Sequence, residues 1–182
     1  FFMAKQFTMK ARDLNNLYSV ISMVSKQELA KVKAGEEMKA IIRHEKLCRE
    51  LDDQNEPYSD FLESKFNKPL KEYCKPYFDR AEAVMKDQTL SSEEKRLNIE
   101  EIDNEMRPVR NLKEQELSKE LNLEEEAVKE VNVKITSEER YELLKFLMEK
   151  IIWDKFEIQN NPALSRKLYV EAVEIIESAK EL

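Results

Sequence analysis

The sequence is poor in the residues that build tight turns and metal sites. Its 182 residues include one glycine, Gly35, together with two cysteines and one histidine. Tight hairpin turns rely on glycine for backbone torsions with positive φ, so this shortage excludes a multistranded β fold. One glycine also excludes the glycine-rich loops that cradle nucleotide phosphates.

Long apolar runs are also missing. No run approaches the roughly 20 residues that span a bilayer, and no basic region precedes an apolar stretch as in a secretion signal. Cys48 and Cys74 do not form a CxxC motif, so a disulfide scaffold is not expected. We therefore expect a cytoplasmic protein with no membrane partner.

Charged residues are abundant, at 38% of the chain against 41% hydrophobic residues, and the formal net charge is −7. This composition is typical of long solvated helices around a modest core. Lysine and arginine alternate with acids instead of clustering, so we expect no direct nucleic acid binding. The acidic excess either keeps the protein soluble or forms a surface that meets a basic partner by imitating nucleic acid.

Two short segments have the alternating pattern of β-strands. In Lys5–Lys10, Phe7 and Met9 lie on one side, and in Val131–Ile135 the apolar residues alternate with Asn132 and Lys134. Two isolated strands are not stable unless they lie on helices. The pattern predicts a two-stranded ribbon that packs on a helical body.

Apolar residues at helical spacing predict helices over most of the remaining chain. Asp13 is the predicted N-cap of the first helix. Three pairs have the spacing of a capping box, in which each side chain bonds the other residue's backbone N–H: Ser25 with Glu28, Ser91 with Glu94, and Thr136 with Glu139. Each pair predicts the start of a helix, and the one at Ser25 is expected to continue through Met38, Ile41, Ile42, Cys48 and Leu51.

Prolines are predicted to end or divide these helices. Pro57 ends the helix that begins after Ser25, Pro76 kinks or divides the next one, and Pro108 interrupts a third. The predicted fold class is all-α, a helical bundle with a minor two-stranded β ribbon, in one domain of residues 1–182. A subdivision would separate a helical body, 1–108, from an acidic segment and a C-terminal helical hairpin, 109–182.

The C-terminal part is predicted as two antiparallel helices, about 138–158 and the segment after Pro162, joined by a turn at 160–162. The first has an apolar arc broader than one neighbouring helix covers. Aromatic side chains dominate binding energy where they are exposed. The interface candidates for self-association or a protein partner are therefore Tyr141, Leu144, Trp153 and Phe156.

Acidic motifs on the same two helices suggest an alternative, a magnesium site. The candidate ligands are Glu138, Glu139, Glu142, Glu171 and Glu174. The pattern resembles the all-α nucleotide pyrophosphatases, in which acids on two helices hold Mg²⁺ against a triphosphate. Glutamates at a helix N-terminus also stabilise the helix dipole without any metal. We favour that interpretation and expect no catalytic residues, no metal and no cofactor.

His44 and Cys48 are four residues apart, the spacing of two metal ligands on one helical face. A zinc site needs three or four protein ligands, and the chain has no second histidine. The favoured interpretation places Cys48 in the core and His44 beside it.

The order of elements resembles that of small uncharacterised proteins of tailed bacteriophages. The features in common are the strand Gln6–Lys10, the helix Leu14–Val24, a second helix from Leu29 to Leu51, and a late acidic helix that leads into Val131–Ile135. The resemblance covers about half of the chain and has no counterpart for residues 57–106. It implies a phage origin, a role in virion assembly or in handling the host, and a location in the host cytoplasm or the virion.

The sequence therefore favours a non-enzymatic protein–protein interaction protein, a phage-encoded assembly or accessory factor that forms an oligomer. One alternative is an acidic phage-encoded inhibitor of a host defence system that targets nucleic acid. The other is a magnesium-dependent enzyme similar to the all-α nucleotide pyrophosphatases.

Overall fold

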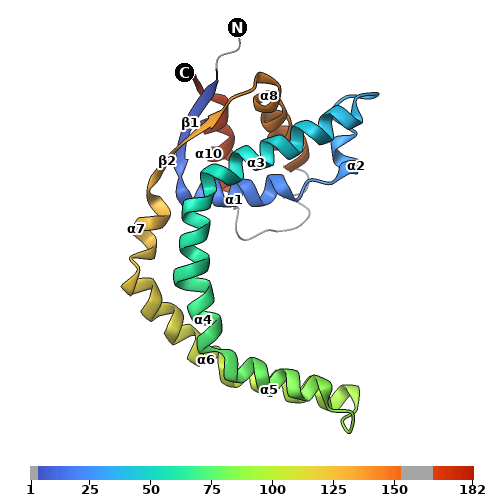
Figure 1. Ribbon diagram of the computed structural model, residues 1–182, viewed down its shortest axis with the longest axis vertical. Helices are drawn as coiled ribbons and strands as arrows, with labels where there is room; N and C mark the ends of the chain where they lie inside the picture. The colour runs from blue at the N-terminus through green and yellow to red at the C-terminus, as the bar shows by residue number, and fades with distance from the viewer. Residues whose placement is uncertain (1–3, 153–165) are drawn as a thin grey trace. The chain divides into compact units, whose positions relative to one another are not determined.

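The computed structural model describes residues 4–152 and 166–182 and is mostly helical, with one small antiparallel sheet. The predicted fold class is thereby confirmed. Figure 1 shows the helices as coiled ribbons and the strands β1 and β2 as arrows.

The chain divides into two compact units. Unit 1 comprises residues 1–59 and 126–182, and unit 2 comprises residues 60–125. Unit 2 is thus inserted into the sequence of unit 1. The division does not fall at the suggested boundary after Pro108, because helix α6 (Ser92–Glu120) runs through that proline.

The sheet of unit 1 contains the two predicted strands. Strand β1 (Lys5–Lys10) pairs antiparallel with β2 (Glu130–Ile135), in a register from Lys5 opposite Ile135 to Lys10 opposite Glu130. A third strand, β3 (Lys180–Glu181), pairs with the other edge of β1, which gives the order β2-β1-β3. The predicted ribbon is confirmed, while β3 was not predicted because two charged residues show no alternation.

One face of the sheet is buried. Phe7 and Met9 of β1 and Val133 and Ile135 of β2 point into the core, whereas the residues between them are exposed or half-buried. Period-two alternation therefore places every apolar strand residue on one face. Buried residues of the helices complete the core of unit 1: Leu14, Leu17, Ile21, Leu29, Leu47, Leu51, Leu144, Leu147, Met148 and Ile176.

Helix α1 (Ala11–Ser22) follows β1 directly. Its N-cap is Lys10, without a side-chain hydrogen bond, so the prediction of Asp13 as N-cap was wrong. The backbone N–H of Ala11 instead donates to the carbonyl of Lys129, 2.8 Å away. A backbone partner from the strand region thus satisfies one of the free donors at the helix start.

The segment after Ser25 forms two helices where one was predicted. The capping box of Ser25 and Glu28 is confirmed, but it opens only the short α2 (Lys26–Leu29). Gly35 has φ +80°, a torsion that favours glycine and does not occur within a helix. The long helix α3 (Glu37–Phe61) begins after it.

Pro57 does not end α3, contrary to the prediction. Proline costs the helix one backbone hydrogen bond, and packing offsets that loss. Ala40, Leu47 and Leu51 form a buried stripe along the helix. The stripe continues to the buried Asn55, whose Nδ2 donates to Asn15 Oδ1 of α1 at 2.9 Å.

Helix α8 (Glu138–Phe146) continues as the π-helical turn η2 (Leu147–Ile152), and α10 spans Arg166–Glu177. The N-cap of α8 is Ser137 and not Thr136. The hydroxyl of Tyr141 donates to the carbonyl of Ile176, and that of Tyr169 donates to the carbonyl of Met148. Residues early in one segment therefore meet residues late in the other, as in an antiparallel pair. The predicted turn at 160–162 lies outside the described residues.

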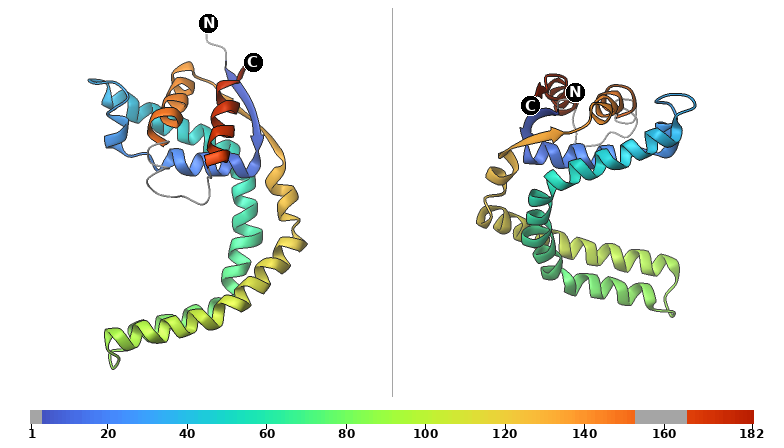
Figure 2. Two further views of the ribbon diagram at one scale, coloured as in Figure 1. Left: turned by 180° about the vertical axis from the view of Figure 1, so that it is seen from behind. Right: turned by 45° about the horizontal axis from the view of Figure 1, so that its top comes forward.

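Unit 2 is a helical hairpin. It contains η1 (Leu62–Asn67), α4 (Lys68–Tyr73), α5 (Lys75–Lys86) and α6, and the chain returns to unit 1 through α7 (Leu123–Val128). Figure 2 shows α5 and α6 side by side. Pro76 separates α4 from α5 as predicted, and the capping box of Ser91 and Glu94 opens α6. Pro108 lies inside α6, so the predicted interruption was wrong.

The core of unit 2 is small. It consists of Leu70, Cys74, Met106 and Leu117, with half-buried Phe66, Tyr77 and Leu121 packed against them. Tyr73, Phe78, Met85, Leu97 and Leu112 are large apolar side chains of this unit that remain exposed.

Candidate interaction groove

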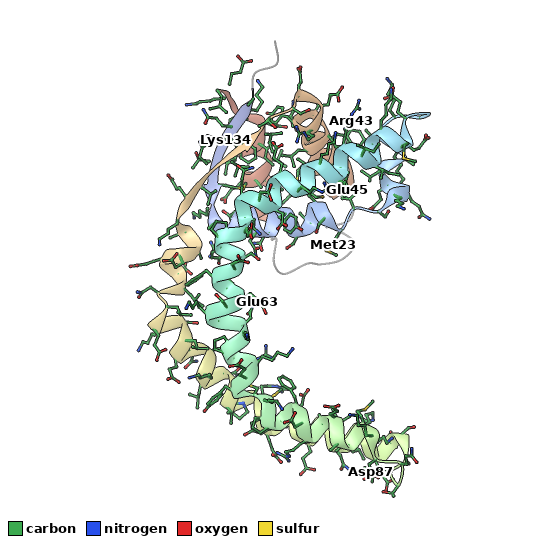
Figure 3. The ribbon with its side chains drawn as sticks, viewed as in Figure 1. Met23, Arg43, Glu45, Glu63, Asp87 and Lys134 are labelled. Atoms are coloured by element: carbon green, nitrogen blue, oxygen red, sulfur yellow. The ribbon has the colours of Figure 1, made fainter. Side chains whose placement is uncertain are left out.

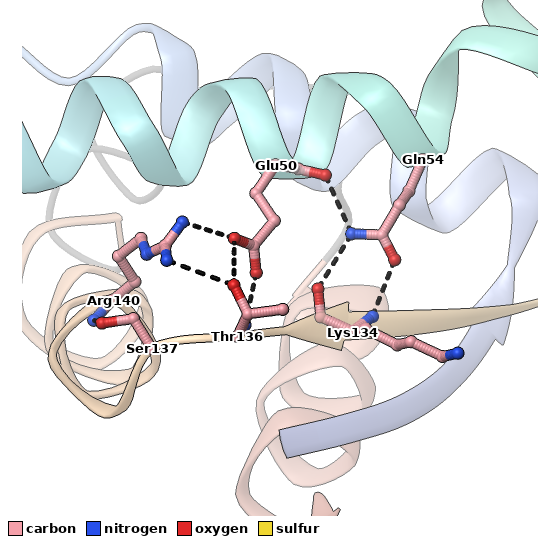
Figure 4. A network of polar contacts seen from close by, with 6 residues as sticks. All are labelled: Glu50, Gln54, Lys134, Thr136, Ser137 and Arg140. Carbon is pink, nitrogen blue, oxygen red and sulfur yellow. Dashed lines mark hydrogen bonds and ion pairs between the residues drawn. The ribbon is translucent and has the colours of Figure 1, made fainter. Parts of the chain in front are cut away.

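Three polar side chains hold the start of α8 on α3 (Figure 4). The carboxylate of Glu50 on α3 accepts from the backbone N–H of Thr136 at 2.6 Å and from its hydroxyl at 3.0 Å. Arg140 donates to the same carboxylate and to the Thr136 hydroxyl. Both ends of this ion pair are largely buried. The contacts fix where α8 begins relative to α3.

The outer edge of β2 is covered by Gln54 of α3, also drawn in Figure 4. The Gln54 amide donates to the carbonyl of Lys134 at 2.9 Å and accepts from its N–H at 2.7 Å. A side-chain amide thus replaces a neighbouring strand at this position. It protects part of the edge from pairing with another chain.

Between α3 and α8 lies a groove that one ion pair crosses. Arg43 Nε of α3 is 3.1 Å from Glu139 Oε2 of α8, and Figure 3 labels Arg43 on the part of α3 next to α8. Both residues line two separate hollows of the surface. We call the two hollows together the α3–α8 groove.

The acidic hollow has a volume of about 460 Å³. Val32, Ala40, Leu143 and Phe146, which are buried or half-buried, form its base. The exposed carboxylates of Glu138, Glu139 and Glu142 form its rim. An apolar base with charged groups at its rim can hold an apolar side chain of a ligand and orient its polar neighbours.

The basic hollow has a volume of about 230 Å³ and shares the ion pair of Arg43 and Glu139 with the acidic hollow. Lys39, Arg43, Lys46 and Arg140 line it, with Glu139 as its only acid and Ile42 as its apolar residue. Four cations thus gather around one hollow in a protein of net charge −7. Lys46 forms no ion pair within the described part of the chain.

Two large apolar side chains of α3 are exposed to solvent, Met38 at 68% and Ile42 at 47%. The sequence analysis predicted a helix through both residues, which α3 confirms, and it made no prediction of their exposure. The buried residues Ala40, Leu47 and Leu51 follow each other at seven and four positions. Ile42 lies about 200° around the helix from Ala40 and therefore on another face. That spacing is the signal in the sequence that could have identified it.

Two of the four predicted interface residues belong to the core. Tyr141 is 5% exposed and Leu144 is fully buried, so neither is available to a partner. Both side chains are buried because α8 packs on both α10 and the sheet. Trp153 and Phe156 lie outside the described residues.

The predicted magnesium ligands do not face a common point. Glu138, Glu139 and Glu142 line the groove beside α3, whereas Glu171 of α10 lines a small pocket beside α1 with Asp13. Glu139 is paired with Arg43, and Glu142 lies 3.6 Å from Lys145. Within residues 4–152 and 166–182, no cluster of three or more acids, histidines or cysteines could hold a metal.

His44 is held by a backbone carbonyl. Its Nε2 lies 2.7 Å from the oxygen of Ile21 and 3.5 Å from Cys48 Sγ. A carbonyl only accepts, so Nε2 carries the proton and is not a free metal ligand. Burial, followed by the charges of Asp52 and Glu45, raises the pKa of the Cys48 thiol to about 11. Cys48 is half-buried and packs against the core, close to the predicted position.

Every helix in the described part of the chain is too short or too polar to cross a membrane. The sequence matches no protein-family model, and comparisons with curated proteins and with solved structures found no match.

Proposed function

We propose that the protein is a non-enzymatic protein-binding factor and that a segment of its partner docks in the α3–α8 groove. The observation that carries the proposal is the exposure of Ile42 in the basic hollow, which shares Arg43 and Glu139 with a second hollow that has an apolar base. A groove between two helices of one unit fits a peptide segment better than it fits a whole domain surface.

A partner gains binding free energy from the apolar area that it covers. Fully burying one aliphatic or aromatic side chain contributes about 1.5–3 kcal/mol. The acidic hollow has an apolar base of Val32, Leu143 and Phe146, against which such a side chain can pack. A partner that also covers Ile42 removes further apolar surface from water. Single anchor residues of this kind dominate many interfaces.

The wider role rests on the resemblance in layout to small proteins of tailed bacteriophages. We include a role in phage assembly, or as an accessory factor, in the proposal on that ground. The resemblance also supports a location in the host cytoplasm or the virion. The groove supports protein binding, whereas the phage role has its support in the resemblance.

A photo-crosslinking amino acid at position 42 tests the proposal. In the cells that naturally produce the protein, light should attach it covalently to one distinct polypeptide. The matched control carries the same amino acid at position 97, because Leu97 of unit 2 is 50% exposed, slightly more than Ile42. The attached polypeptide should be lost when Phe146 at the base of the acidic hollow is replaced by aspartate and the variant remains folded by circular dichroism.

Two results would reject this function. In one, position 42 gives no specific product. In the other, position 97 attaches the same polypeptide as efficiently as position 42, which would place binding on unit 2.

A further inference from the structure

The two hollows of the α3–α8 groove have opposite charge. The basic hollow is lined by four cations and one carboxylate. The acidic hollow is lined by three carboxylates and one cation. Arg43 and Glu139 belong to both and neutralise each other at the centre of the groove. The charges that remain are therefore positive at one end and negative at the other.

Each end of the groove has one charged side chain that forms no ion pair among the described residues. Lys46 lines the basic hollow, and Glu138 lines the acidic one. Neither forms an ion pair or a side-chain hydrogen bond among the residues that the structure describes. By contrast, Arg140 is occupied by Glu50, and Lys39 lies 3.6 Å from Glu36. Lys46 and Glu138 are thus free to meet charges of a partner.

We infer that the bound partner segment has an acidic side chain at one end, an apolar centre and a basic side chain at the other end. This inference rests on the proposed function and names the chemistry of the partner. The acidic side chain lies against Lys46, and the basic one lies against Glu138 and Glu142. The apolar centre covers Ile42 and the base of the acidic hollow.

Charge complementarity of this kind selects partners more than it raises affinity. A segment with two acidic ends meets Glu138 and Glu142 with like charge, and a segment with two basic ends meets Lys46. Each mismatch is unfavourable, so the groove discriminates against both. A single exposed charge pair changes affinity little, but reversing one charge of the protein changes attraction into repulsion. We expect an effect of roughly five- to tenfold on Kd.

The experiment selects short random-sequence peptides, displayed on a surface, against the full chain. Peptides that bind the groove are recognised because Ile42→Glu abolishes their binding, while Leu97→Glu does not. Among these peptides, we expect an apolar centre with an acid on one side and a base on the other. Either chain direction satisfies the inference, because only the spatial order of charges matters.

Two charge reversals sharpen the test. Lys46→Glu reverses the one cation of the basic hollow that has no acidic partner in the described residues, so it should remove the preference for an acid at that end of the peptide. Glu138→Lys reverses the one carboxylate of the acidic hollow that has no basic partner in the described residues, so it should weaken the preference for a base at the other end. The matched controls are Lys71→Glu and Glu120→Lys in unit 2, which have the same charge changes on exposed residues. Neither control should shift the selection.

The two proposals fail separately. If peptides depend on Ile42 but show no charge order, or do not respond to either reversal, the inferred partner chemistry is overturned and protein binding at the groove stands. If no selected peptide depends on Ile42, both the partner chemistry and the groove are overturned.

Discussion

Two tyrosine hydroxyls fasten α10 to the rest of unit 1. Tyr141 of α8 reaches the carbonyl of Ile176 at 2.6 Å, and Tyr169 of α10 reaches the carbonyl of Met148. Both rings are buried, and each hydroxyl satisfies a carbonyl that lies in the core region. A buried hydroxyl needs such a partner, because leaving it unpaired away from water is costly.

Tyr141→Phe removes one of these hydrogen bonds and leaves the ring in place. We expect the free energy of unfolding of unit 1 to fall by about 1–2 kcal/mol, measured by urea denaturation followed by circular dichroism. Tyr73→Phe is the control, because Tyr73 is exposed. An equal loss in both variants would show that the bond to Ile176 contributes nothing.

Cys48 should react slowly with alkylating agents at neutral pH. Its thiol has a pKa raised from 9.0 to about 11, mainly by burial and then by the negative charge of Asp52. The neutral thiol is therefore the form present at pH 7, and the reactive thiolate increases only as the pH approaches 11. Mass spectrometry of the peptide that contains Cys48 measures the alkylation rate against pH.

Asp52→Asn removes one of the charges that oppose the thiolate, so the inflection of that rate profile should move to lower pH. An inflection near 9 in the unaltered protein would contradict the raised pKa.

At the scale of elements, Glu50 determines how α8 is attached to α3. Glu50→Ala leaves Arg140 without its ion pair and Thr136 without an acceptor. Because this pair is largely buried, we expect a loss of about 2–3 kcal/mol of unfolding free energy. Glu45→Ala is the control on the same helix, where an exposed pair with Arg49 contributes less than about 0.5 kcal/mol. Chemical denaturation of both variants gives the comparison, and similar losses would refute the role of Glu50.

Local patterns predicted the elements whose signals are independent of tertiary packing. The alternation of Lys5–Lys10 and the capping boxes at Ser25 and Ser91 depend on neighbouring residues only, and all three were found. Pro57 and Pro108 were misjudged because a helix tolerates proline when packing on either side offsets one lost hydrogen bond. The break between α2 and α3 at Gly35 depends on the positive φ of that residue, which the spacing of apolar residues does not reveal.

The groove was harder to predict than the fold. Tyr141 and Leu144 have the pattern of an amphipathic helix, but that pattern does not distinguish packing inside the chain from packing on a partner. The charges of the groove come from α3 and α8, nearly a hundred residues apart in sequence. Their meeting depends on the contacts of Glu50 and Gln54 with the β2 region. No local rule gives those contacts.

At the scale of the whole molecule, the two units differ in how much apolar surface they bury. Unit 1 has a large core that the sheet and several helices share. The core of unit 2 rests on Leu70, Cys74, Met106 and Leu117. Regions with few buried apolar contacts open at lower free energy than the rest of a protein. The inserted hairpin should therefore open before unit 1 does.

Native-state hydrogen exchange measures this difference directly. Amides of α5 and α6 should exchange with lower opening free energies than amides of β1 and the buried face of α3. Leu117→Ala should reduce protection in unit 2 only, whereas Leu47→Ala should reduce it throughout unit 1 by about 2–5 kcal/mol. Equal protection in both units of the unaltered protein would contradict the expectation.

The pairing of β1 with β2 also has a consequence for synthesis on the ribosome. The side chains of Asn132 and Gln6 bond across the two strands, and 126 positions separate them in the sequence. A nascent chain therefore displays β1 with both of its edges unpaired throughout the translation of the whole inserted hairpin. Helices form within microseconds, but this strand must wait for a partner that emerges late. Non-local pairing makes folding slower, and in that interval an unpaired strand can combine with another chain.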